Sequence, residues 1–131
     1  MATIILPFPP ACLSGHNTGH WHVKAKIIAD HRMEAFALTK AARIMVPETG
    51  DIRIHFRFVP PDNRGDRCNF AGRLKPQIDG IAQALGCNDK RFLPSYEFCE
   101  PEAPGRVEVE ILGRENAVAF DHGPNRGQLG G

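Results

Sequence analysis

The sequence predicts a single α+β domain spanning residues 1–131, with two main helices packed on a small mixed sheet of about four strands. Three observations lead to this prediction. Short segments of alternating apolar and polar residues are interspersed with two longer segments of helical periodicity. Their order along the chain is β-α-β-α-β-β, which is typical of helices packed on one small sheet. At 131 residues the chain can bury one core but is short of the length at which domains usually divide.

The first third of the chain predicts one short strand and one long helix. TIILPFPP is expected to be a strand ended by its prolines, which cannot donate to a sheet ladder. The glycine-containing segment that follows is expected to be a loop. From about Trp21 to Met45 there is no internal proline or glycine, so we expect a helix that ends before Pro47 and Gly50. Its apolar stripe is predicted to run through Val23, Ile27, Ala35, Leu38, Ala42 and Met45.

The middle of the chain predicts a strand followed by a second helix. In DIRIHFRFV, residues 51–59, apolar and polar side chains alternate strictly, which indicates one buried face and one basic face. PPDNRG then supplies a turn. Apolar spacing predicts a helix from about Asn69 to Leu85, ended by Gly86. Pro76 should either kink this helix or mark its true first turn.

The last third predicts two strands and a loose tail. SYEFCE and RVEVEIL both alternate in the manner of half-buried strands. PEAPG between them predicts a hairpin connection of about five residues. From about residue 114 the chain is rich in glycine and asparagine, and we expect it to be loose.

Composition narrows the class of protein. No apolar run approaches the roughly 20 residues of a spanning helix, and the opening lacks a basic n-region, so we expect a cytoplasmic protein with no membrane segment. The four cysteines form no CxxC pair and are expected to be free thiols.

Charge is divided along the chain. From Arg53 to Arg91 eight basic residues face four acidic ones, a net charge of +4. Such a basic segment suits a polyanion such as DNA, although an evenly solvated surface explains the same count. Both alternatives also stand for the basic strand face of Arg53, His55 and Arg57.

Three acidic residues and one lysine surround the second predicted helix. Lys75 and Asp79 lie four residues apart on one helix face, Asp66 precedes the helix and Asp89 follows it. If the carboxylates meet, they form an oxygen-rich site suited to Mg²⁺ or Mn²⁺, with the lysine placed to offset charge on a phosphate. The alternative is a set of solvated helix ends and a surface salt bridge.

A family resemblance favours the first alternative. From Asp66 onward, DRCNFAGRLKPQIDGIAQALGCND resembles the signature of the RusA family of Holliday-junction resolvases. That signature runs broadly as DxDN, a lysine shortly after it, a helix carrying D-A/G-x-x-x-A-L/G, and a pair of aspartates. LPFPP, followed by a polar loop ending in His20 and Trp21 and then a basic helix, is similar to the opening of phage-type members. The resemblance covers the chain from Ile4 to Leu112.

The resemblance implies a homodimer that cuts branched DNA with a divalent metal, Mg²⁺ or Mn²⁺, and a lysine that assists phosphodiester hydrolysis. Asp66 matches the first aspartate of DxDN, Asn69 its asparagine, Lys75 the lysine, Asp79 the mid-helix aspartate, and Asp89 the second residue of the terminal pair. The implied catalytic residues are Asp66, Lys75 and Asp89. The implied metal ligands are Asp66 and Asp89, with Asp79 as a further candidate.

Two positions depart from the family pattern. Cys68 stands where the second metal-binding aspartate is expected, and Asn88 where the first aspartate of the terminal pair is expected. In an extended segment Cys68 would point the same way as Asp66, so its thiol would take the direction of the missing carboxylate. A thiolate is a soft ligand and Mg²⁺ prefers oxygen, so we expect Asp79, Asn69 or water to complete the coordination.

The implied function is an endodeoxyribonuclease, of phage or prophage origin, that resolves four-way DNA junctions in recombination or repair. The alternatives are a catalytically weakened branched-DNA-binding protein of the same fold, and a protein whose basic middle serves only solubility. The histidine-containing loop is expected to contact the DNA backbone, with zinc binding as the weaker alternative. The expected DNA-binding residues are Arg64, Arg67, Arg73, Lys90, Arg91 and His20.

Overall fold

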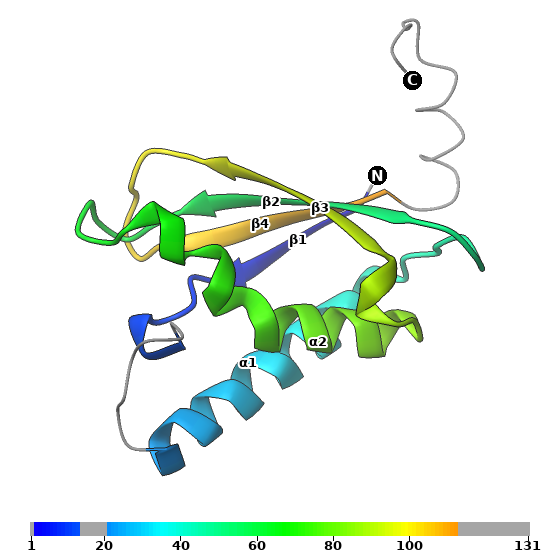
Figure 1. Cartoon of the computed structure of the whole chain (residues 1–131), viewed down its shortest axis with the longest axis horizontal. Coiled ribbons are helices and arrows are strands. Elements are labelled where there is room, and N and C mark those ends of the chain that lie inside the picture. The colour runs from blue at the N-terminus through cyan, green and yellow to red at the C-terminus, as the bar shows by residue number, and fades with distance from the viewer. Residues whose placement is uncertain (1, 14–20, 113–131) are drawn as a thin grey trace, which may run out of the picture.

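Both helices of the domain lie on one side of a four-stranded sheet (Figure 1). The computed structural model describes residues 2–13 and 21–112. In chain order the elements are β1 (Ala2–Pro7), α1 (Trp21–Ala42), β2 (Ile52–Val59), α2 (Lys75–Leu85), β3 (Phe92–Phe98) and β4 (Arg106–Ile111). Four 3₁₀ turns join them: η1 (Ala11–Leu13), η2 (Arg67–Asn69), η3 (Ala71–Leu74) and η4 (Asp89–Arg91). The small α+β architecture is confirmed, and the predicted loose tail lies outside the described residues.

The described part of the chain contains no helix that combines the length and hydropathy needed to cross a membrane.

The order of strands in the sheet is β1-β4-β2-β3. β4 pairs antiparallel with both β1 and β2, whereas β3 pairs parallel with β2. The sheet is therefore mixed, and the predicted hairpin between β3 and β4 is wrong because β2 lies between them. Alternation located both strands, but it reports only which face of a strand is buried and does not identify the neighbouring strand.

β3 also begins earlier than SYEFCE indicated, at Phe92, and it contains Pro94. A proline is tolerated there because β3 is an edge strand, with one side of its backbone unpaired.

The core forms between the helices and one face of the sheet. The apolar residues of β2 are almost fully buried, as their alternation predicted, and Phe56 and Phe58 have no exposed surface. Apolar side chains of β1, β4, the two helices and the segment before α2 complete the core: Ile4, Leu6, Ala35, Phe70, Leu74, Ile81, Val107, Val109 and Ile111.

The helices cross at a very close contact between Gly80 of α2 and the backbone of α1. A Cβ atom added at Gly80 would lie 2.2 Å from the carbonyl oxygen of Arg32 and 3.1 Å from the Cβ of Ala35. Ala35 is completely buried, so both helices present their smallest side chains where they touch. Because Gly80 has no side chain, the backbone of α1 can lie directly against α2 at this point.

The predicted apolar stripe of the first helix is only partly buried. Among the side chains described for α1, Ala35 and Thr39 are buried, whereas Val23 is 61% exposed. The reason is length: α1 has 22 residues and α2 has 11, so about half of α1 extends past its partner. The helix ends at Ala42, where Arg43 adopts a positive φ of 53°, before the predicted end at Met45.

The second predicted helix is broken into three pieces. Turns η2 and η3 cover residues 67–74, and a regular α-helix begins only at Lys75. Pro76 lies in the first turn of α2, where its missing N–H has no partner to lose, so the second of its two expected roles is confirmed. Gly86 ends the helix in the left-handed conformation with a φ of 68°, as predicted.

Candidate active site

Asp66 forms the start of the site by capping turn η2. Its backbone is extended, and its Oδ1 accepts a hydrogen bond from the backbone N–H of Cys68 at 3.0 Å. The residues after it form a 3₁₀ turn, so the extended D-x-C geometry expected from the sequence is wrong. Cys68 lies inside this turn and is exposed, so the alternation of an extended strand does not apply to its direction relative to Asp66.

Lys75 lies at the first position of α2 and joins two carboxylates. Its Nζ lies 2.6 Å from Oδ2 of Asp89 and 3.0 Å from Oδ1 of Asp79. Asp79 is one helical turn along α2, whereas Asp89 lies beyond the end of that helix. The left-handed backbone at Gly86 turns the chain back, so that a carboxylate 14 residues away in sequence reaches the lysine.

Asn88, the second departure from the family pattern, has a structural role. Its side-chain oxygen accepts a hydrogen bond from the backbone N–H of Lys90 at 2.9 Å and so caps turn η4, which carries Asp89. Asparagine and aspartate are about equally good caps. The substitution therefore keeps the turn that presents Asp89.

Electrostatics hold the lysine cluster in its charged form. The hydrogen bond to Asp89, followed by that to Asp79, raises the pKa of Lys75 above its ordinary value. The same contact to Lys75 lowers the pKa of Asp89 below the usual carboxyl range. At neutral pH the Lys75 ammonium group is thus paired with an ionised Asp89.

The residues present fit part of the implied metal site. Oδ1 of Asp79 and Oδ2 of Asp89 both contact Lys75 Nζ, so these oxygens lie no further apart than the sum of the two distances. Two close carboxylates suit Mg²⁺, which commonly keeps several waters. Asp66 does not belong to this pair: it caps η2 and lines a cavity of about 480 Å³ beside Phe70 and Arg73. Within residues 2–13 and 21–112, no three histidine, cysteine, aspartate or glutamate side chains are arranged as a metal site.

The expected DNA-binding residues fall into two groups. Arg64, Arg67 and Lys90 are exposed, and Arg64 pairs with Asp62 at 3.0 Å. Arg73 and Arg91 are held by the protein itself. The Arg73 guanidinium is buried over the Phe70 ring at 5.2 Å, where desolvation lowers its pKa. His20 lies outside the described residues.

Arg91 fixes the segment before β2. Its guanidinium donates to the backbone carbonyl oxygens of Gly50, at 2.8 Å, and Pro47. This arginine therefore orders the chain between α1 and β2, in addition to any contact that it makes with DNA.

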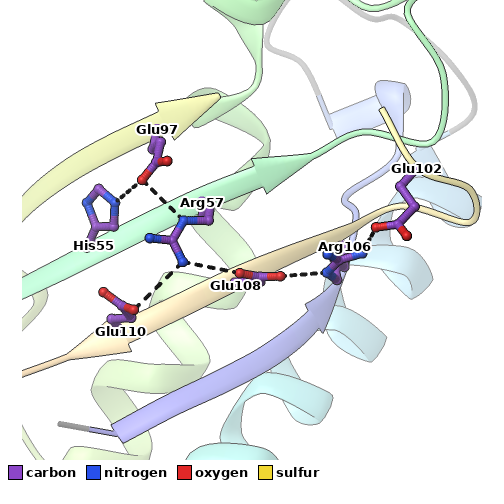
Figure 2. A network of polar contacts seen from close by, with 7 residues as sticks. All are labelled: His55, Arg57, Glu97, Glu102, Arg106, Glu108 and Glu110. Carbon is purple, nitrogen blue, oxygen red and sulfur yellow. Dashed lines mark hydrogen bonds and ion pairs between the residues drawn. The ribbon is translucent and has the colours of Figure 1, made fainter. Parts of the chain in front are cut away.

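The uncovered face of the sheet carries a network of ion pairs (Figure 2). Arg57 contacts glutamates on both neighbouring strands, with its nearest atoms 3.1 Å from Glu97, 3.4 Å from Glu108 and 3.8 Å from Glu110. Glu97 also contacts His55, and the hydrogen bond with His55, followed by that from Arg57, lowers the pKa of the Glu97 carboxyl. At the other end of the network, Arg106 joins Glu102 to Glu108 (Figure 2).

This network favours one of the two expectations for the basic strand face. The sequence shows Arg57 on the same face as His55, but the glutamates come from β3 and β4, whose positions beside β2 were not predicted. Because Arg57 is already surrounded by carboxylates, this face is poorly suited to tracking phosphates. A solvated, charge-compensated face is the better description.

Comparison with known proteins gives one relative. The chain is 33% identical over 119 residues to an uncharacterized protein of Xylella fastidiosa (strain Temecula1 / ATCC 700964), in an alignment that covers 86% of this chain and 77% of that protein. No family model matches the sequence.

Proposed function

We propose that this chain, which belongs to the same family as the Xylella fastidiosa protein, is a RusA-like endodeoxyribonuclease that resolves four-way DNA junctions. The observation that carries the proposal is the contact of Lys75 with both Asp79 and Asp89. These are three of the residues that the resemblance to RusA resolvases assigns to the site, and the fold brings them together across 14 residues of sequence.

The side chains have distinct roles in the proposed reaction. Asp79 and Asp89 would hold a divalent cation, and Asp66, which caps turn η2, would contribute once DNA is bound. Bound Mg²⁺ or Mn²⁺ would activate water for attack on phosphorus and neutralise phosphate charge. The raised pKa of Lys75 keeps its ammonium group charged, so that it stabilises negative charge developing on the scissile phosphate.

The same lysine supports the site before metal binds. Its ammonium group lies between the two carboxylates and offsets their repulsion. When DNA is bound, we expect the Lys75 ammonium group to turn toward the phosphate. Its side chain is 64% exposed and therefore has room for this movement.

DNA approaches from the side of the turns rather than from the open sheet face. Arg67 and Lys90 are exposed on turns η2 and η4, and Arg64 is exposed just before η2, whereas Arg57 is engaged by glutamates. A homodimer, implied by the resemblance, would offer two equivalent sites to the two opposed strands of a junction.

The test is incubation of the purified protein with a synthetic four-way junction and Mg²⁺ or Mn²⁺. We expect metal-dependent cleavage that Asp89→Asn and Asp66→Asn each abolish while binding persists. Full activity in Asp66→Asn would remove Asp66 from the ligand set. Binding without cleavage under either metal would instead support the alternative of a catalytically weakened branched-DNA-binding protein, which the exposed Cys68 at an aspartate position favours.

A further inference from the structure

Two aromatic side chains of β3 are half exposed although they belong to the core-facing side of the sheet. Tyr96 is 41% exposed and Phe98 is 44% exposed. In the parallel register Tyr96 lies beside Phe56 and Phe98 beside Phe58, and both of these neighbours are fully buried. The ladder of four rings therefore runs from the core to the open edge of the sheet.

The rings of this ladder lie nearly parallel. Phe98 stacks on Phe58 with centroids 5.4 Å apart and an angle of 11°, and Tyr96 stacks on Phe56 at 5.7 Å and 19°. Phe70 packs against both Phe58 and Phe98 and fixes that end. Because the inner partners are buried, the two outer rings are held in one orientation, with their exposed surface directed away from the core.

A further strand is a poor occupant for this edge. The N–H of Cys99 donates to the carbonyl of Phe58 at 2.8 Å, so alternate residues of β3 point their N–H groups toward β2. Pro94 is one of the alternate residues whose backbone faces away from β2, and a proline has no N–H to donate there. An added strand would lose a ladder bond there, as proline on an edge strand commonly ensures.

Exposed cations lie near both ends of β3. β3 starts directly after turn η4, which carries the exposed Lys90, and runs toward turns η2 and η3 (Figure 1). At that far end Phe70 and Arg67 line a cavity of about 420 Å³ together with Asp62, which is paired with Arg64, and Asp66. Glu97, the acid within β3, lies on the opposite face and is bound to Arg57 and His55. The parallel rings suit an occupant with flat rings, which can continue the stack.

We propose that Tyr96 and Phe98 form a stacking platform for unpaired DNA bases at the branch point, on the strand that follows the turn carrying Asp89. The inference rests on the proposed junction-cutting function. Bases at a branch point are free to leave the helical stack, and aromatic side chains bind them through their π faces with little regard to sequence. The platform would hold the junction open while Arg67 and Lys90 contact the phosphates on either side.

The chain offers a direct spectroscopic test because it has one tyrosine, Tyr96, and one tryptophan, Trp21. Trp21 is 70% exposed, so Trp21→Phe leaves Tyr96 as the sole strong emitter with little effect on folding. In this background Asp89→Asn prevents cleavage during the titration. We expect a four-way junction to quench Tyr96 fluorescence as it binds, after correction for DNA absorbance.

Affinity variants supply the second measurement. Tyr96→Leu and Phe98→Leu keep an apolar side chain for folding but remove the π face, and each should weaken junction binding by about 5- to 150-fold. Leu93→Ala is the matched control, because Leu93 is 49% exposed on the same strand but on the opposite face, and it should bind as the parent does.

The outcomes separate this inference from the proposed function. Junction binding without quenching, or leucine variants that bind as tightly as the parent, would overturn the platform while leaving cleavage intact. If the junction quenches Tyr96 fluorescence but the protein with Asp89 intact does not cut the junction, the platform is supported and the nuclease is refuted. If Tyr96 fluorescence is instead quenched without DNA as the protein concentration rises, and sedimentation shows a dimer forming over the same range, the platform binds a second copy of the chain. That result would overturn the inference.

Discussion

Replacing Gly80 with alanine tests the helix contact that positions the candidate site. The added Cβ would lie 2.2 Å from the carbonyl oxygen of Arg32, more than an ångström closer than the roughly 3.5 Å of a favourable contact. The atom that it meets is backbone, which cannot rotate away, so α1 and α2 must separate. Asp79 precedes Gly80 in the chain, and the shift would also move the carboxylate that contacts Lys75.

The expected loss of stability combines two opposed effects. Overpacking in a core destabilises by about 1–3 kcal/mol. Alanine gains up to about 1 kcal/mol over glycine in a helix, so the upper end of the overpacking range, which the 2.2 Å approach to backbone favours, leaves a net loss of about 2 kcal/mol. For a domain of this size the midpoint of thermal unfolding should fall by about 4–10 °C, measured by circular dichroism.

Gly72→Ala is the control, since a Cβ there meets no atom within 4 Å. We expect its stability to stay within about 0.5 kcal/mol of the parent, as for substitutions away from special contacts. If Gly80→Ala unfolds at the same temperature as Gly72→Ala, the close crossing of α1 and α2 is wrong.

Three further predictions concern charge and metal. Lys75→Ala should lower the cleavage rate with little change in junction affinity. Lys75 lowers the pKa of Asp89, so the stabilisation from their contact is present above the ordinary carboxyl pKa and is lost as pH falls through the lowered value. Lys75→Ala lacks this stabilisation, so its acid unfolding should begin at a higher pH than that of the parent. Acid unfolding at the same pH in both proteins would contradict the contact. Cys68→Asp should raise Mg²⁺ affinity, measured by calorimetry, and a fall in both affinity and rate would mean that the thiol is required. Arg67→Gln should weaken junction binding and reduce its salt slope by about 1, whereas Arg57→Gln should leave the slope unchanged; equal slopes for both would place DNA on the open sheet face.

Local patterns of the sequence predicted the elements of this fold well. Strict alternation in residues 51–59 identified β2 and its buried face, and Gly86 marked the end of α2. These features depend on residues close in sequence, where side-chain spacing and backbone preference act directly. Pro76 was informative in the same way, since both of its expected roles placed a break in the second helix near it.

Contacts between distant segments were beyond such patterns. The insertion of β4 between β1 and β2 depends on which edges meet in space, and both β3 and β4 alternate alike. For the same reason, the pairing of Arg57 with Glu108 and Glu110 was not predicted, because it depends on the register between β2 and β4.

For the candidate site, the sequence predicted that Lys75 and Asp79 are neighbours, because one helix carries both. It left open whether Asp89 reaches them, since that depends on the backbone at Gly86. The extended backbone expected for D-x-C was wrong, because residues 67–69 form a 3₁₀ turn that Asp66 caps. Helix-like spacing in residues 69–85 concealed the turns, which have a different period.

The central claim is that the cluster around Lys75 cuts a four-way junction, and strand-by-strand mapping of the products tests it most directly. A junction is labelled in turn on each of its strands, incubated with the protein and Mg²⁺ or Mn²⁺, and resolved on a denaturing gel. The account predicts paired, symmetrically placed cuts in two opposed strands, absent with Asp89→Asn and absent on a linear duplex of the same sequence. Intact strands under both metals, or equal cutting of the linear duplex, would contradict it.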